Sequence, residues 1–319
     1  MWIRDSQRNN TNNKNERLQK KKKENTEIKQ QIKQNKVKTL LDALPYIKQF
    51  SGKIVVIKYG GSAQTSPELQ EKFAQDISLL ALTGIKPVIV HGGGAKISDM
   101  LTKLNIPSEF VDGHRVTCED SMRIVEMVLS GEINKNLTSL LNHHGTKSIG
   151  ISGKDSSCIK AIAKENGKFG YTGIVTEVNA NVINNLIDEG FIPVIAPIAD
   201  SAQPNHPGFN INADIAASQV AIALQADKVL FLTDTKGVLD KNGELLNDLD
   251  KADVDSFIED GTIAGGMIPK VRSCTDAIEN GVAKAHIIDG RVEHSILLEL
   301  FTSDGVGTQF LQKETKENN

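Results

Sequence analysis

"KIVVIKYGGSAQ", residues 53–64, places a continuous apolar run ahead of one lysine, Lys58, and a glycine pair, Gly60 and Gly61. A run of Val and Ile without polar alternation is typical of a parallel strand that is covered on both faces. Ser66 and Pro67 follow at the positions of a helix N-cap and a first helical residue, and helical sequence continues to Gly84. The stretch therefore predicts a strand, a glycine turn and a helix.

The same alternation of apolar runs and helical segments continues along the chain. Further apolar runs occur at 86–91, 148–153, 191–199 and 227–234, and another ends near residue 290. We expect an α/β fold, a three-layer α/β/α sandwich with a central, mainly parallel sheet. Ligands of open parallel sheets bind beyond the carboxyl ends of the strands, so the residues that directly follow each strand are the site candidates.

Composition excludes several classes of protein. Three widely spaced cysteines, Cys118, Cys158 and Cys274, without a CxxC pair argue against a disulfide framework and a zinc site. No apolar run approaches the roughly 20 residues of a membrane span, and no signal peptide is expected, so we predict no membrane association.

Charge is distributed unevenly between the N-terminal segment and the rest of the chain. Residues 1–38 carry twelve Lys or Arg and four acidic residues, a net +8 in a chain whose total is −3. Lys, Asn and Gln make up 21 of these 38 residues, which predicts a disordered basic tail over residues 1–36. Trp2 is the only aromatic residue there, so we expect no nucleic-acid partner.

Two glycine loops are candidates for an anion site. Gly60 and Gly61 follow the first predicted strand, and Gly92–Gly94 follow the second. Glycine lets backbone N–H groups approach a ligand closely, and a turn that opens a helix suits a phosphate or a carboxylate. The P-loop and the dinucleotide fingerprint are both absent, because no GxxxxGK[ST] or strand-linked GxGxxG occurs.

A second basic centre and one carboxylate complete the pattern. Lys270 follows Gly265 and Gly266, and "GFNINADIAAS" places Asp214 at the start of a helix. Each residue has a structural alternative: Lys58 as a strand end, Lys270 as a solvated helix residue, Asp214 as a helix cap. Together, two lysines, a carboxylate and glycine loops are what phosphoryl transfer requires, because the protein must position and neutralise a highly charged group.

Six motifs carry a resemblance that covers residues 37–310. "IKYGGS", "VIVHGGG", "DGHRVT", "FNINADIAA", "LTDTKGVLD" and "GGMIPKV" occur in the order and at the spacing of the amino acid kinase family. The chain looks most like the members that use ATP and Mg²⁺ to phosphorylate the side-chain carboxylate of N-acetyl-L-glutamate in arginine synthesis. The resemblance implies an acetylglutamate-binding N-lobe over 52–226, an ATP-binding C-lobe over 227–312, and a flexible C-terminus over 313–319.

The resemblance also implies roles for single residues. Lys58 and Lys270 would contact the transferred phosphoryl group, and Asp214 would hold both ammonium groups in place. The implied substrate-binding residues are Gly93, Gly94, Arg115, Asn210 and Asn212, and the implied nucleotide-binding residues are Gly61, Thr233, Asp234, Gly265 and Gly266. Mg²⁺ would enter with ATP, and no dedicated protein metal site is expected.

Regulation and assembly are further implications of the resemblance. Residues 37–51 predict an amphipathic helix with a break or kink at Pro45, and they resemble the helix that joins dimers into a hexamer in the arginine-inhibited members. Residues 294–310 resemble the arginine site of those members, with Glu299 and Tyr46 as candidate partners of L-arginine. The structural alternative for Glu299 is a solvated helix residue.

Source and competing functions stay open from sequence. The Lys/Asn/Gln bias favours a plastid-encoded protein of the stroma over one of the bacterial cytoplasm, and a photosynthetic host would imply a complex with the PII signalling protein. A sister kinase acting on glutamate, aspartate, carbamate or uridylate shares the lobe design. A catalytically silent regulatory subunit would be expected to lose one of Lys58, Asp214 and Lys270, all of which are present.

Overall fold

The computed structural model describes residues 27–111, 114–303 and 305–312. The chain divides into two compact units, residues 1–49 and 50–319, and each is described by itself. Most of the predicted basic tail, and all of the predicted flexible segment 313–319, lie outside the described residues.

One helix occupies residues 27–50. The prediction of disorder up to residue 36 is therefore wrong for residues 27–36. That prediction rested on the Lys/Asn/Gln composition, whereas Ile28 and Ile32 continue the helical spacing of the apolar residues beyond them, among Lys and Gln residues that favour helices. The helix also continues through Pro45 without a break, and the predicted alternative of a kink there stays a prediction.

Residues 50–319 are built on an eight-stranded sheet with the order β12-β14-β13-β11-β1-β2-β8-β5. All neighbouring strands run parallel except β13 and β14, which confirms the mainly parallel sheet. The strands are β1 (Ile54–Tyr59), β2 (Lys86–His91), β5 (Ser148–Ser152), β8 (Ile192–Ala196), β11 (Lys228–Thr233), β12 (Asp248–Leu249), β13 (Lys284–Asp289) and β14 (Thr308–Phe310).

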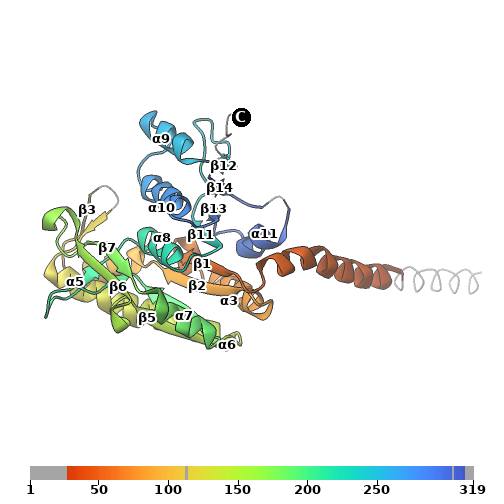
Figure 1. The fold of residues 1–319 in the computed structure, drawn as a ribbon, viewed down its shortest axis with the longest axis horizontal. Helices are drawn as coiled ribbons and strands as arrows, with labels where there is room; N and C mark the ends of the chain where they lie inside the picture. Colours follow the sequence, from red (N-terminus) through yellow and green to blue (C-terminus); the bar gives the residue numbers. More distant parts are fainter. Residues whose placement is uncertain (1–26, 112–113, 304, 313–319) are drawn as a thin grey trace, which may run out of the picture. The chain divides into compact units, whose positions relative to one another are not determined.

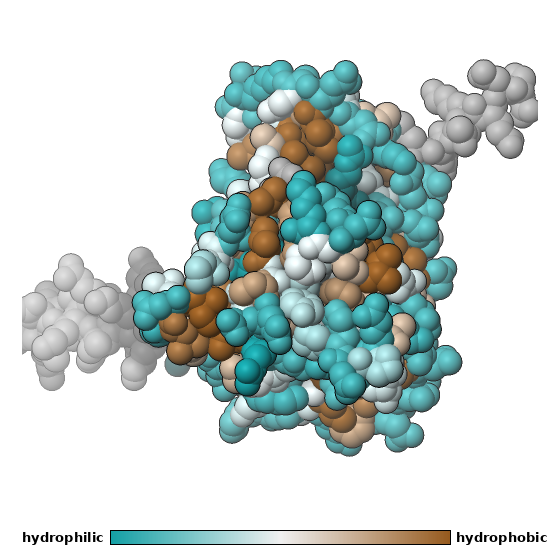
Figure 2. All heavy atoms as spheres, turned by 90° about the vertical axis from the view of Figure 1, so that its left-hand side faces the viewer, coloured by the Kyte–Doolittle hydropathy of each residue, from teal (hydrophilic) through white to brown (hydrophobic). Residues whose placement is uncertain are grey.

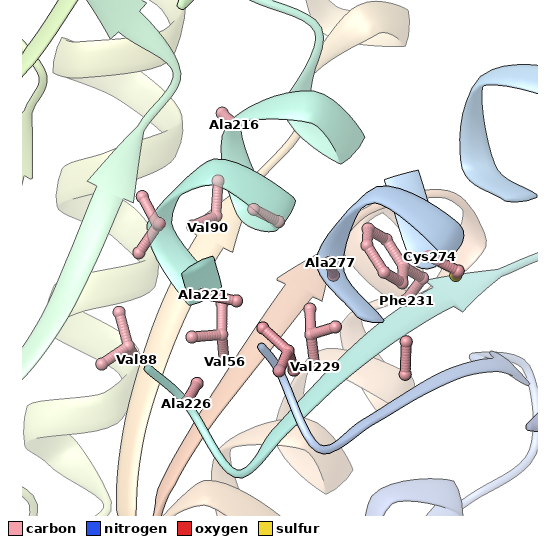
Figure 3. Close-up of a cluster of buried hydrophobic side chains, with 14 of the residues drawn as sticks. Val56, Val88, Val90, Ala216, Ala221, Ala226, Val229, Phe231, Cys274 and Ala277 are labelled. Carbon is pink, nitrogen blue, oxygen red and sulfur yellow. The ribbon is translucent and has the colours of Figure 1, made fainter. Parts of the chain in front are cut away.

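Helices cover both faces of this sheet and confirm the three-layer sandwich (Figure 1). One face carries α7 (Ala180–Asp188), α8 (Ala213–Ala223), α9 (Lys251–Glu259) and α10 (Met267–Glu279), and the other carries α3 (Pro67–Leu82), α6 (Asn134–His143) and α11 (Ser295–Phe301). Side chains of β1 alternate between the two cores: Val56 packs on the first face, and Val55 and Ile57 on the second. Figure 3 shows Val56 beside Val229 under the alanines of α8.

A third, smaller core lies beside the end of β8. Helices α4 (Gly94–Lys103) and α5 (Glu119–Glu126), with the π-helix η1 (Met127–Ile133), pack there around Leu101, Met122 and Leu129. The remaining elements are α2 (Ser62–Thr65), the short helices η2 (Asp155–Ser157) and η3 (Lys164–Gly167), and three two-stranded sheets: β3 (Glu109–Val111) with β4 (His114–Val116), β6 (Ile159–Ala163) with β7 (Gly173–Val178), and β9 (Ile198–Ala199) with β10 (Phe209–Asn210).

The two predicted lobes share the large sheet. Their predicted boundary, after residue 226, falls just before β11, which pairs with β1. The chain leaves β1 toward β2, and it leaves the neighbouring β11 in the opposite direction, toward β13. A crevice is therefore expected at the carboxyl ends of β1 and β11.

The described residues contain no helix that could span a membrane. None of the described helices is both long and apolar enough to cross a bilayer. On the face drawn in Figure 2, hydrophobic residues form separate patches within a largely hydrophilic surface.

Candidate functional site

A cleft of about 470 Å³ opens beyond the carboxyl ends of β1 and β2. The loops after these two strands line it, together with the β3–β4 hairpin and the start of α8. Of the residues singled out from sequence, the cleft wall contains Lys58, Gly61, Gly93, Gly94, Arg115, Asn210, Asn212, Asp214 and Asp234.

Asp214 lies between two ammonium groups. Its Oδ1 is 3.0 Å from Nζ of Lys58, and its Oδ2 accepts a 2.8 Å hydrogen bond from Nζ of Lys270. Lys58 comes from the end of β1, and Lys270 from the first turns of α10. The Lys58 contact has the distance of an ion pair but not the geometry of a hydrogen bond, because Oδ1 has no hydrogen-bond partner.

Burial makes this cluster electrostatically strong. The side chains of Lys58 and Asp214 are 9% and 7% exposed. Burial alone would raise the pKa of Asp214, but the two ammonium groups lower it to about 2. Burial lowers the pKa of Lys58, and the charge of Asp214 opposes that effect. The carboxylate is therefore ionised at neutral pH, and it serves to hold two cations at one point of the cleft.

Asn212, and not Asp214, caps helix α8. Its side-chain Oδ1 accepts hydrogen bonds from the backbone N–H groups of Asp214 (2.8 Å) and Ile215 (3.3 Å). The cap alternative for Asp214 is thus wrong, because a cap at Asn212 leaves the Asp214 carboxylate available to the lysines. The capping bonds occupy the Asn212 carbonyl, and the predicted substrate contact of Asn212 remains a prediction.

The two glycine loops are closely packed where they border the cleft. Gly61 has φ +66°, and a Cβ there would lie 2.6 Å from Oδ1 of Asp234, which accepts a 2.7 Å hydrogen bond from the backbone N–H of Ser62. At Gly93 a Cβ would lie 2.4 Å from Ile133 and 2.6 Å from Leu129, both in η1. A Cβ at either position would make these neighbouring side chains shift, and at Gly61 the positive φ also favours glycine.

Arg115 presents a buried guanidinium group to the cleft. It donates to the backbone carbonyl of Gly94 (3.1 Å), to Oγ of Ser98 (2.9 Å) and to Oγ of Ser108, and it lies 4.5 Å over the ring of Phe110. No carboxylate of the described residues pairs with it. A buried cation with only neutral partners is a ready receptor for a carboxylate.

The predicted nucleotide residues lie partly apart from this cleft. Asp234 lines it and directly follows β11, whereas Thr233 is buried at the end of that strand. Gly265 and Gly266 precede α10, outside the cleft wall, on the same segment as Lys270. The structure therefore gathers Lys58, Asp214 and the substrate candidates into one cleft. Lys270 contacts Asp214 without lining the cleft, and not every nucleotide candidate lines it.

Glu299 belongs to a different, buried cluster. Its carboxylate accepts from Nζ of Lys228 (2.9 Å), Nδ1 of His286 (2.8 Å) and the backbone N–H of Val306 (2.9 Å). Burial alone would raise the pKa of Glu299, but these neighbours lower it to about 2. The solvated alternative for Glu299 is wrong. Lys228 begins β11, so this cluster lies toward the opposite edge of the sheet from the cleft. Tyr46 lies half-buried in the helix of residues 27–50.

Sequence reasoning missed several polar residues that support the site. Ser98 and Ser108 hold Arg115, and Thr117 and Thr172 lie buried behind Asn210. Isolated Ser and Thr residues carry no motif, and their position becomes apparent only when strands distant in sequence are paired. Of these four residues, only Thr117 lies within a motif that the sequence analysis quoted, "DGHRVT".

No cluster of three or more His, Cys, Asp or Glu side chains within the described residues could hold a metal ion. Asp234 is the carboxylate of the cleft that is not paired with a lysine.

Comparisons with known proteins agree on one family. Residues 53–289 match the amino acid kinase family. The acetylglutamate kinase of Aliarcobacter butzleri is 71% identical over 283 residues, which cover 89% of this chain and 94% of that protein. The acetylglutamate kinase of Wolinella succinogenes is 62% identical, covering 86% of this chain and 97% of that protein.

The fold also matches a solved structure. The N-acetylglutamate synthase of Neisseria gonorrhoeae, complexed with coenzyme A and N-acetyl-glutamate, superposes with a TM-score of 0.78 at 25% identity over 87% of this chain. The matched region spans 64% of the synthase chain.

Proposed function

The chain belongs to the amino acid kinase family, and we propose that it transfers the γ-phosphoryl group of ATP to the side-chain carboxylate of N-acetyl-L-glutamate. The product is N-acetyl-L-glutamyl 5-phosphate, in the second step of arginine biosynthesis. The high identity to acetylglutamate kinases over nearly their whole length supports this substrate.

The juxtaposition of Lys58, Asp214 and Lys270 carries the proposal. In phosphoryl transfer the migrating group spreads negative charge over its equatorial oxygens, and the protein must position and neutralise that charge. Two ammonium groups on opposite oxygens of one buried carboxylate provide that neutralisation from two sides. Asp214 acts as their organiser and not as a base, because the acceptor carboxylate is already ionised at neutral pH.

Arg115 supports recognition of the second carboxylate of the substrate. Its guanidinium group lines the cleft without an acidic partner among the described residues and is held by neutral oxygens. Gly93, Gly94, Asn210 and Asn212 would contribute polar contacts to the same molecule. Together these groups favour an amino acid with two carboxylates over carbamate or uridylate.

ATP would approach from the side of Asp234, Gly61, Thr233, Gly265 and Gly266. Mg²⁺ usually keeps several waters and is held by phosphates and one or two carboxylates, and it would neutralise phosphate charge. The residues present fit such an ion without a protein cage, and Asp234 is the carboxylate that would hold it.

Feedback inhibition by L-arginine, with Glu299 as a partner of its guanidinium group, is part of the proposal. The resemblance of residues 294–310 supports it, whereas the Glu299 carboxylate is buried and already paired with Lys228 and His286. An incoming guanidinium group would have to replace Lys228 or His286. Tyr46 remains a second candidate partner. If added L-arginine does not change the activity, this regulation is contradicted.

Assembly and location are proposed on weaker grounds. The exposed apolar residues of the helix over 27–50 support a homo-oligomer, a hexamer built as a trimer of dimers. The relatives reported above come from bacteria, so we now favour the bacterial cytoplasm over the plastid stroma. A complex with PII depended on a photosynthetic host and stays a prediction.

An ATP-coupled assay of the purified chain tests the activity. N-acetyl-L-glutamate should be phosphorylated with at least tenfold higher kcat/KM than L-glutamate or L-aspartate, since a site built for the acetamido group loses contacts with each competitor. If L-glutamate or L-aspartate is phosphorylated in preference to N-acetyl-L-glutamate, the proposed substrate is wrong and the activity is that of a sister kinase. No turnover of any of them would favour a silent regulatory subunit.

A further inference from the structure

A chain of buried hydrogen bonds runs from the cleft into the protein behind it. Nδ2 of Asn210 lies 3.2 Å from Oγ1 of Thr117, which lies 2.9 Å from Oγ1 of Thr172. Oγ1 of Thr172 lies 2.5 Å from the backbone carbonyl of Arg115. Thr117 and Thr172 are 0% and 2% exposed, so water does not compete for these contacts.

The hydroxyl hydrogens fix the direction of this chain. A carbonyl only accepts, so Thr172 must donate its one hydroxyl hydrogen to Arg115. Thr117 then uses its own hydroxyl hydrogen for the contact with Thr172 or for the Arg115 carbonyl, which lies 3.4 Å from its Oγ1. Thr117 has no hydrogen left for Asn210, and Asn210 must therefore present its NH₂ group to Thr117. The orientation of the Asn210 amide follows from the polarity of its buried neighbours.

This orientation decides what Asn210 offers to a ligand. Its Nδ2 is engaged by Thr117, while no described residue donates to its Oδ1. Asn210 lines the cleft together with Arg115, and the Thr172 hydroxyl ties the Arg115 backbone to the same chain. The Asn210 side chain and the Arg115 backbone are thus tied to the same pair of threonines, with an acceptor oxygen on Asn210 and a cation on Arg115.

We propose that Thr117 and Thr172 are positioning residues that hold Oδ1 of Asn210 toward the substrate, where it accepts a hydrogen bond from the acetamido N–H of N-acetylglutamate. This inference rests on the proposed function. According to this inference, the two threonines make the site selective for substrates that carry an N–H donor, and they do so through Asn210. Without the Thr172 hydroxyl, the Thr117 hydroxyl is released from that contact. When it donates to Asn210 and not to the Arg115 carbonyl 3.4 Å away, the amide is able to flip.

Steady-state kinetics of Thr172→Val and Thr172→Ser test the inference. Valine keeps the shape of threonine without the hydroxyl, and serine keeps the hydroxyl. Thr172→Val should raise KM for N-acetylglutamate about tenfold, the cost of one misplaced buried hydrogen bond. KM for ATP should change less than twofold, and Thr172→Ser should restore the wild-type KM. Thr275→Val, a buried threonine of α10 that donates to the backbone carbonyl of Arg272, is the matched control.

An ester analogue gives an independent readout. 2-Acetoxyglutarate replaces the acetamido N–H with oxygen and cannot donate to Oδ1. The wild-type protein should prefer N-acetylglutamate at least tenfold in kcat/KM, and Thr172→Val should lose most of that preference. Equal kcat/KM for both compounds in the wild type overturns the inference, even if Thr172→Val does not fold.

The outcomes separate this inference from the proposed function. A wild-type protein that does not phosphorylate N-acetylglutamate would refute both. A wild-type protein that does so, with an unchanged KM and an unchanged ester preference in Thr172→Val, would refute the threonine roles alone. Equal rises in KM for ATP and N-acetylglutamate would show a general distortion and would likewise refute them.

Discussion

At the scale of single residues, the site depends on one carboxylate that is shared by two lysines from opposite ends of the folded chain. Removing either lysine leaves Asp214 with one partner, so the buried charge remains balanced. Removing Asp214 would instead leave two buried ammonium groups facing each other, which costs considerably more. The lysine variants are therefore the ones that separate catalysis from folding.

We expect Lys58→Ala and Lys270→Ala to fold normally and to lose about 10²-fold or more in kcat, because each removes one charge that stabilises the transition state. KM for N-acetylglutamate should change far less. Circular dichroism and steady-state kinetics on the same preparations measure both effects. Lys103→Ala, which removes a solvent-exposed pair with Asp99, is the control. A kcat near that of the wild type in either site variant would refute the assignment.

Glu299 predicts a pH dependence of stability. Its pKa falls from an ordinary 4.5 to about 2 in the folded protein, so the ionised carboxylate stabilises the fold fully above about pH 4.5. That contribution is lost as pH falls toward 2. Glu299→Gln should therefore lower the free energy of unfolding by about 3 kcal/mol at pH 7, and by less than half of that at pH 3. Urea unfolding at both pH values measures the difference, and a pH-independent difference would contradict the argument.

At the scale of elements, the loop after β2 is shaped by the π-helix η1. Side chains of Leu129 and Ile133 fill the space that a Cβ at Gly93 would need. A π-helix sets these side chains differently from an α-helix, and such segments often occur beside functional sites. The contact couples the small third core to the loop whose backbone N–H groups are predicted to bind the substrate.

Gly93→Ala should therefore destabilise the protein by about 1–3 kcal/mol, the usual cost of overpacking a core. Adding Ile133→Val removes the methyl group closest to the new Cβ and should restore part of the loss. Gly94→Ala is the matched control for stability, because nothing lies within 4 Å of its Cβ position. Thermal or urea unfolding of the four proteins forms a double-mutant cycle. Additive effects of the Gly93 and Ile133 changes would contradict direct contact.

Regular elements were predictable where local patterns were strong. Helix α3 begins at Pro67, and Ser66 caps it by accepting from the N–H of Leu69, as the sequence predicts. The helix of residues 27–36 was missed because the Lys/Asn/Gln composition outweighed a weak apolar pattern. The two-stranded sheets contain strands as short as two residues, whose pairing depends on partners far along the chain.

At the scale of the whole molecule, the apolar residues of the N-terminal helix predict an assembly. Leu40 and Leu41 are 71% and 61% exposed. Leu40→Asp combined with Leu41→Asp should reduce the solution mass from a hexamer to a dimer, because two charges cannot be buried in an apolar interface. Analytical ultracentrifugation measures the mass, with Lys38→Asp as a control for the added charge. An unchanged mass would show that this helix does not hold the oligomer together.

The sequence by itself determined the order of strands and helices, the glycine turns and the two lysines with their carboxylate, because these depend on local periodicity and on motifs within a few residues. Only the tertiary structure decided which oxygen of Asp214 each lysine contacts, that Asn212 is the cap, and that Glu299 is buried with Lys228 and His286. It also decided the threonine chain behind Asn210. Such contacts arise when strands distant along the chain are brought into register, and hydrogen-bond polarity and burial exist only after that pairing.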